Sequence, residues 1–147
     1  MRVHLILPNV EGPATAMARA LANAHLQAKD IDYINAHATS TPVGDANKAK
    51  AIYQLFGSQT PVSSTKSMTG HECWMAGASE LVYSILMMQH DFIALNINIE
   101  ALDEDSQKLH IITQTTQQPI RAFLSNSFGF GGTNLVIIVK CGDEAMR

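Results

Sequence analysis

The sequence has too little of several residue types to support some common classes of protein. Its two cysteines, Cys73 and Cys141, make no disulfide framework and lack the spacing of a zinc site. No apolar run approaches the ~20 residues that span a bilayer, and the short run at residues 5–7 stops at Pro8, so it forms no signal segment. The net charge of -3, with scattered lysines and arginines, gives no reason to expect nucleic acid as a partner. We therefore expect a soluble cytoplasmic protein with no metal, no other cofactor and no membrane contact.

The composition that remains is that of a folded globular chain. Hydrophobic residues make up 46% of the sequence and charged residues 16%, which argues against disorder. No repeat, low-complexity tract or linker divides the chain. Residues 1–147 are therefore expected to form a single domain.

Helical and strand patterns alternate early in the sequence, and strands follow one another near its end. Helices are predicted at residues 12–27, from residues 44–45 to a stop at Gly57, and at residues 74–88. Strands are predicted at residues 31–36, 61–64, 109–113, 122–125 and 135–140. The helix at residues 74–88 lacks a full polar face, so we expect it to be largely buried. This order predicts an α/β fold with a mixed sheet.

Three loops rich in glycine, threonine and serine carry the most informative residues. They are HATSTPVGD at residues 37–45, KSMTGH at residues 66–71 and SNSFGFGGTN at residues 125–134. Two histidines and a lysine on such loops suit a site that polarises a carbonyl group and stabilises a developing negative charge. The glycines at residues 129–132 precede a β-branched run rather than a helix, which favours a turn between two strands over a phosphate-binding loop.

With these three loops, the chain resembles the C-terminal part of the elongating β-ketoacyl-acyl-carrier-protein synthases of fatty acid and polyketide synthesis. The loops match that family's HGTSTPxGD, KxxxGH and NSFGFGGTN signatures in the same order, and similarity covers nearly the whole chain from about residue 11 onward. The resemblance implies the C-terminal half of a thiolase-like fold, with helices packed on a mixed β-sheet. It also implies decarboxylative condensation of an acyl thioester with malonyl-acyl-carrier protein, and the carrier protein as partner.

The resemblance also implies which residues carry the chemistry. His37 and His71 match the family's two catalytic histidines, which act during decarboxylation of the malonyl group and during condensation. Lys66 matches the lysine of the second motif, and we expect it to organise charge rather than act as a base, because an ammonium group disfavours protonation of nearby imidazoles. Glu80, on the following helix, is similar to a family glutamate and is expected to pair with Lys66.

Four further residues match positions that contact the substrate in the family. Thr39 and Thr41 match the hydroxyls that hold the phosphopantetheine arm. Phe130 matches the gate beside the nucleophile, and Phe128 lies next to it in the motif. These residues are therefore expected to bind substrate rather than to transfer protons.

Two features depart from the family's pattern. Ala38 stands where the family usually has glycine, which is a small change if the local φ is negative and a strain if it is positive. Residues 72–75 replace the small residues that usually follow the second histidine, and Trp74 adds bulk where the pocket or dimer seam of this fold would lie. The resemblance therefore leaves the preferred acyl-chain length open, but not the class of reaction.

The sequence also lacks a residue that the family needs. The family's nucleophilic cysteine lies at a strand-to-helix turn in its N-terminal half, and nothing before His37 resembles that turn. The chain is therefore expected to be a truncated protein, a split subunit or a partial gene product, without the acyl-loading step. A homodimer or heterodimer is expected for the complete enzyme, and an exposed apolar face for this chain by itself.

Other interpretations of these residues stay open from the sequence alone. Residues 71–73 have the chemistry of metal ligands, although adjacent residues rarely converge on one ion. Cys73 could be a displaced nucleophile near a helix start, and Glu80 could be an ordinary exposed carboxylate. For the whole chain, one alternative is a non-catalytic partner subunit like the chain-length factors of ketosynthases. The other is a thiolase, whose final motif carries a cysteine where Phe130 stands here.

Overall fold

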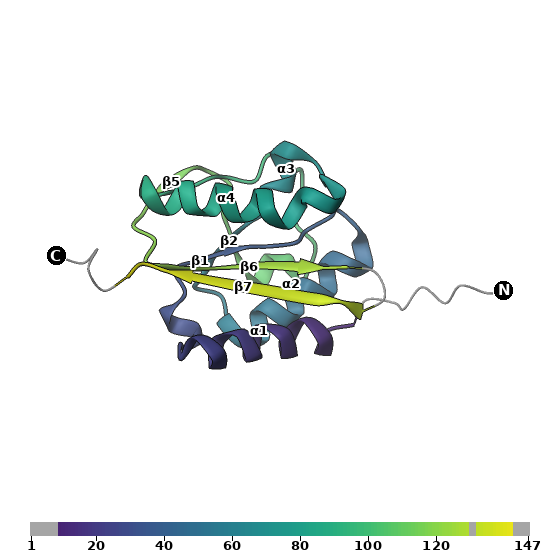
Figure 1. Cartoon of the computed structure of the whole chain (residues 1–147). Coiled ribbons are helices and arrows are strands. Elements are labelled where there is room, and N and C mark those ends of the chain that lie inside the picture. The colour runs from purple at the N-terminus through teal and green to yellow at the C-terminus, as the bar shows by residue number, and fades with distance from the viewer. Residues whose placement is uncertain (1–8, 130–131, 143–147) are drawn as a thin grey trace.

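The computed structural model describes residues 9–129 and 132–142. Its main sheet consists of β1 (Tyr33–Asn35), β2 (Pro61–Ser63), β4 (His110–Ile111), β6 (Ala122–Phe128) and β7 (Asn134–Lys140). The helices are α1 (Glu11–Ala24), α2 (Pro42–Phe56), α3 (Lys66–Thr69) and α4 (Ala76–Gln89). Helices α1 and α2 lie on one face of the sheet, and α3 and α4 lie on the other (Figure 1). The predicted α/β class with helices packed on a sheet is confirmed.

The five strands follow the order β4-β2-β1-β6-β7 and form a mixed sheet. Strand β1 pairs in parallel with both β2 and β6, β2 pairs in parallel with β4, and β7 runs antiparallel to β6. A smaller antiparallel pair, β3 (Phe92–Ile93) with β5 (Thr116–Gln117), was not predicted from the sequence. The parallel pairings matter for the site, because they bring the carboxyl ends of β2, β1 and β6 to the same edge of the sheet.

Alternate residues of the central strands supply the two hydrophobic cores. Ile34 and Leu124, which are register partners, face α1 and α2, while Tyr33 and Phe123 face α4. All four side chains are fully buried. A strand turns successive side chains to opposite faces, so β1 and β6 are apolar on both sides, as strands covered by helices on both faces must be.

Helix α2 begins earlier than the sequence analysis predicted. It starts at Pro42 rather than at residues 44–45, because the fixed φ of proline suits the first helical turn, where its missing N–H costs nothing. Its predicted stop is confirmed: Gly57 follows the last turn with a φ of 66°. Helix α1 has Pro13 in its first turn, as predicted, and ends before His25, whose φ of 53° is left-handed.

Helix α4 is less buried than its composition suggested. Its buried residues are Ala76, Glu80, Ser84 and Met87, which lie toward the sheet. On its outer side Val82 is 53% exposed and Leu86 is 43% exposed. The prediction of a largely buried helix was therefore wrong for this chain, because only one face of the helix meets the sheet, whereas the expected exposed apolar face is present.

The segment between β6 and β7 joins two antiparallel strands, as predicted, and β7 begins two residues after Gly132. The Gly129 backbone N–H donates a 2.8 Å hydrogen bond to the Thr133 carbonyl across this turn. Phe130, the predicted gate, lies outside the described residues. In the part of the chain that the structure describes, no helix is long and apolar enough to cross a membrane.

Candidate active site

The three motifs singled out in the sequence converge because each lies at, or just after, the carboxyl end of a neighbouring parallel strand. His37 comes two residues after the end of β1, and Lys66 comes three residues after the end of β2. The motif at residues 125–128 forms the end of β6 itself. Since β1 lies between β2 and β6, His37 occupies the middle of the site.

The backbone and ring of His37 are held by the body of the protein. Its backbone N–H donates a 2.8 Å hydrogen bond to Oδ1 of Asn126, a fully buried residue on β6. The side chain is buried, and the ring atom Nδ1 has no hydrogen-bond partner. Burial, and then the charges of Lys66, Lys48 and His71, lower the pKa of His37 to about 3. His37 is therefore a neutral imidazole at physiological pH.

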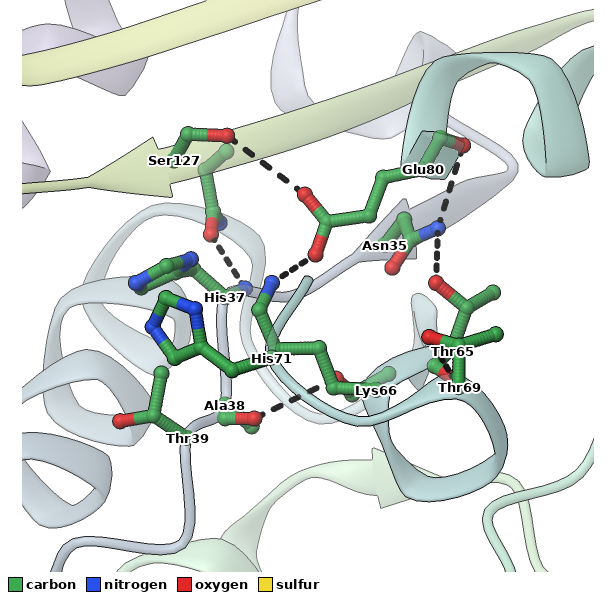
Figure 2. A network of polar contacts seen from close by, with 12 residues as sticks. Asn35, His37, Ala38, Thr39, Thr65, Lys66, Thr69, His71, Glu80 and Ser127 are labelled. Atoms are coloured by element: carbon green, nitrogen blue, oxygen red, sulfur yellow. Dashed lines mark hydrogen bonds and ion pairs between the residues drawn. The ribbon is translucent and has the colours of Figure 1, made fainter. Parts of the chain in front are cut away.

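His71 meets His37 from an exposed turn. The two ring centroids are 5.6 Å apart and the ring planes are inclined at 87° (Figure 2). Nδ1 of His71 accepts a 3.2 Å hydrogen bond from the backbone N–H of Cys73. This geometry assigns the proton of the neutral ring to Nε2, which leaves Nε2–H free to donate to a ligand. Glu72 and Cys73 both have left-handed φ values, 52° and 46°, which curl the turn back onto the imidazole.

Lys66 extends from α3 into the interior and makes a buried ion pair with Glu80 of α4. Ser127 at the end of β6 donates to the other carboxylate oxygen of Glu80 at 3.5 Å, so three elements meet at this carboxylate (Figure 2). Burial and the nearby Lys48 lower the pKa of Lys66 to about 8, which still leaves it a cation at neutral pH. The predicted pairing is therefore present, and the alternative of an exposed Glu80 was wrong.

A second polar network holds β1 against α3 and α4 near the ion pair. The buried Nδ2 of Asn35 on β1 donates to Oγ of Ser84 at 3.0 Å and to Oγ1 of Thr65 at 3.4 Å. Ser84 in turn donates to the carbonyl of Glu80 at 2.7 Å. These bonds tie β1, the start of α3 and α4 together, so the loops that carry His37 and Lys66 have little freedom to move apart.

A cleft of about 630 Å³ opens beside the histidines. Ala38, Thr39, Lys66 and His71 lie on its wall, and residues 96–103 line it as well. Asn96 anchors that segment: its Oδ1 accepts the backbone N–H of Ser64 at 2.8 Å. The cleft has the size of a small-molecule site and exposes the loops at residues 37–45 and 66–71 to one ligand.

The structure brings together most of the residues that the sequence analysis named. His37, His71, Lys66 and Glu80 form one cluster, and the Phe128 ring lies 6.3 Å from the His37 ring. Thr39 lines the cleft, and its hydroxyl oxygen lies 3.3 Å from that of the exposed Thr41. Their roles in catalysis and binding stay predictions at this point.

The two departures from the family pattern have little effect on this cluster. Ala38 does not adopt a left-handed φ, so its methyl group adds no backbone strain. Trp74 is fully exposed and is not among the residues that line the cleft. The expectation that Trp74 adds bulk to a pocket is therefore wrong for this cleft.

Cys73 has no geometry of an activated nucleophile in this site. Its exposed thiol belongs to a residue whose hydrogen bond to His71 runs through the backbone N–H. Within residues 9–129 and 132–142, no group of three or more His, Cys, Asp or Glu side chains is arranged to hold a metal ion.

Sequence reasoning gave no role to several residues that build the site. Asn126 and Ser127 belong to the third motif, but their contacts with His37 and Glu80 cross 89 and 47 residues of sequence. Lys48 was missed altogether, although its spacing of three from Asp45 on a helix was a usable signal. Asn35, inside a short apolar strand, gave no signal of its own.

Comparison with known proteins agrees with this geometry. A β-ketoacyl synthase from Burkholderia phymatum STM815 superposes with a TM-score of 0.87 at 35% identity, over 94% of this chain and 34% of that one. A type II polyketide synthase acyl-carrier protein in complex with its ketosynthase gives a TM-score of 0.86 at 30% identity, over 97% and 36%. The fold is that of the ketosynthases.

The family follows from the sequence match. The model of the β-ketoacyl synthase C-terminal domain matches residues 2–100, and this chain belongs to that family. It is 46% identical over 137 residues to 3-oxoacyl-[acyl-carrier-protein] synthase 1 of Escherichia coli (strain K12), which covers 92% of this chain and 33% of the relative. The chain thus spans about a third of the length of the curated relatives it matches.

Proposed function

We propose that this chain is the C-terminal catalytic portion of a 3-oxoacyl-acyl-carrier-protein synthase. The observation that carries the proposal is the contact between a buried neutral imidazole, His37, and a second imidazole, His71, whose Nε2–H is free to donate. Two such donors aimed at one oxygen stabilise negative charge that develops on it. Membership of the β-ketoacyl synthase family supplies the reaction in which that charge arises.

In the proposed reaction a malonyl thioester loses carbon dioxide. The bond between its carboxylate carbon and its α-carbon breaks, and the electron pair spreads from the α-carbon onto the thioester oxygen. Nε2–H groups of His37 and His71 donate to that oxygen and stabilise the enolate. The α-carbon then attacks the carbonyl carbon of an acyl-cysteine thioester, and the cysteine leaves as a thiolate.

Lys66 contributes charge to this step rather than a proton. Its pKa of about 8 keeps it cationic, and its charge is one of the causes that lower the pKa of His37. A cation beside the imidazoles favours their neutral, hydrogen-bonding form. Glu80 and Ser127 hold the ammonium group in place through the buried ion pair.

The remaining parts of the reaction involve groups outside the described site. We propose that the acyl-carrying cysteine belongs to the part of the relatives that this chain does not cover. The proposal includes acyl carrier protein as the bearer of the malonyl and acyl groups, and a dimer with a second copy or a homologous subunit. The similarity to a ketosynthase in complex with its carrier protein supports the first of these partners.

A chimera tests the proposal directly. The matching third of the Escherichia coli synthase is replaced by this chain, and the product is assayed for release of carbon dioxide from malonyl-acyl-carrier protein and for formation of 3-oxoacyl-acyl-carrier protein. We expect both activities, and we expect His71→Ala to lower them about 10²–10³-fold through loss of one oxyanion donor. His90→Ala, at the exposed end of α4, is the matched control and should not change the rate.

Two outcomes would contradict the proposal. A folded chimera that neither releases carbon dioxide nor condenses would favour a non-catalytic partner of the chain-length-factor type. A covalent acyl adduct on this chain alone, absent from Cys73→Ser and detected by intact-protein mass spectrometry, would show that the chain carries its own nucleophile.

A further inference from the structure

A second lysine faces the cleft from α2. The Lys48 side chain is 11% exposed, and its Nζ lies 3.4 Å from Oγ1 of Thr39 and 3.4 Å from Oδ1 of Asp45. Asp45 also accepts the backbone N–H of Thr39 at 3.2 Å, so the three residues close a small network at the cleft wall. Burial of a charged lysine costs free energy, which its contacts with Thr39 and Asp45 offset.

We propose that Lys48 is a positioning residue of this site, which fixes the direction of hydrogen bonding at Thr39 and Thr41 and places a positive charge at the cleft wall near His37. An ammonium group can only donate, so Oγ1 of Thr39 must accept from it. The Thr39 hydroxyl proton is then directed elsewhere, and Oγ1 of Thr41 at 3.3 Å is a ready acceptor. The chain of donors runs outward and ends in an exposed hydroxyl that donates to a ligand.

This direction selects the chemistry of the ligand. A hydroxyl aligned to donate binds an acceptor oxygen, such as an amide carbonyl of the thioester arm, better than it binds an N–H group. Gly44, buried in the first turn of α2, makes room for the arrangement, because a Cβ there would stand 2.3 Å from Oγ1 of Thr41. The assignment of the ligand as a pantetheine arm rests on the proposed function, whereas the charge effect does not.

The charge effect follows from what surrounds His37. The charged or titratable groups that act on its imidazole come from three places: Lys66 on α3, His71 on the turn after α3, and Lys48 on α2. Lys66 is paired with a buried carboxylate, and Lys48 with Asp45. Both lysines lower the pKa of His37, so each contributes to keeping the imidazole neutral.

Histidine titration by NMR on this chain tests the charge effect without any assay of activity. We expect Lys48→Met and Lys48→Gln each to raise the pKa of His37 by roughly half a unit or more. Lys48→Arg should restore the original pKa of His37. Lys50→Met is the matched control, since Lys50 is half exposed on the same helix and pairs with Asp105, and it should leave the titration unchanged. An unchanged His37 titration in folded Lys48→Met and Lys48→Gln would overturn the charge effect.

Binding of acetyl-pantetheine, followed on the same samples, tests the positioning effect. Lys48→Met should weaken the affinity about three- to tenfold, as expected for the loss of an oriented hydrogen bond. Lys48→Gln, which keeps a donor without the charge, should retain most of the affinity. Equal affinity in wild type and Lys48→Met would overturn the positioning effect. Absence of binding by every variant would count against the proposed function, and the titration would still decide the charge effect.

Discussion

His37 and His71 lie in contact, yet different kinds of structure hold them. His37 follows a central strand, is buried, and has its backbone N–H bonded to a fully buried asparagine. His71 lies on an exposed turn, and the two residues after it have left-handed φ values. A single backbone N–H, that of Cys73, orients its ring. One half of the site is therefore built into the core, while the other half depends on a short local turn.

The core and the turn each supply a different property that the site needs. The core can depress the pKa of His37 because it removes water from the ring. The turn keeps Nε2 of His71 accessible, which burial would prevent. A site that needs both a neutral imidazole and an accessible donor can obtain them from two differently placed histidines.

The largest effect should come from the ion pair that supports both halves. Glu80→Ala leaves Lys66 buried without its partner, and we expect the free energy of unfolding to fall by about 3–5 kcal/mol. Urea denaturation followed by circular dichroism measures this loss. Replacing both residues with methionine should recover most of it, and Glu100→Ala, an exposed acid, is the control. A double variant no more stable than Glu80→Ala would show that the pair is not the cause.

Loss of one hydrogen bond should lower the free energy of unfolding more at His37 than at His71, and both losses should be smaller than that of Glu80→Ala. Asn126→Ala leaves the buried backbone N–H of His37 without an acceptor, and we expect it to cost about 1–3 kcal/mol. His71→Ala removes the acceptor of the Cys73 N–H, which water can replace, so its cost should stay within about 0.5 kcal/mol. Equal losses in the two variants would remove the distinction between a core half and a turn half.

The pH dependence of stability should report His37 itself. Its folded pKa of about 3 lies below the ordinary value of about 6.5, so the unfolded chain takes up the proton first as pH falls. The contribution of His37 to the free energy of unfolding should therefore be fully present above pH ~6.5 and should be lost progressively toward pH ~3. Between pH 7.5 and 5.5 we expect wild type to lose about 1 kcal/mol more than His37→Gln in urea titrations. Parallel losses in the two proteins would show that His37 is not held neutral.

The smallest effect should come from Trp74, the large exposed residue of the turn that follows His71. Trp74 is fully exposed, so Trp74→Ser should change the free energy of unfolding by less than about 0.5 kcal/mol. Thermal and urea denaturation measure this. A loss above 1 kcal/mol would mean that the turn packs against the rest of the molecule through this ring, and the contrast between the two halves would weaken.

The sequence named the residues that meet in the cluster, but not the residues that hold them there. The motifs at residues 37–45, 66–71 and 125–134 named both histidines and the lysine, which the structure brings together, and the helix position of Glu80 suggested its pairing with Lys66. The contacts of Asn126, Ser127 and Lys48 could not be predicted, because each depends on which strands are neighbours and on where a helix lies against a loop. The burial of α4 was mispredicted for the same reason: composition shows that a helix is apolar, but not how many of its faces find a neighbour.

Local sequence patterns predict the main helices and strands, the polar loops and the residue types that those loops carry, but not the small pair β3 and β5. These are local properties, set by periodicity, by proline and glycine, and by short motifs. That the three loops share one edge of the sheet follows from the fold, since the parallel pairings of β1 with β2 and β6 join distant segments. The tertiary structure also decided that His37 is neutral, because the pKa of a side chain depends on burial and on charges that folding brings near.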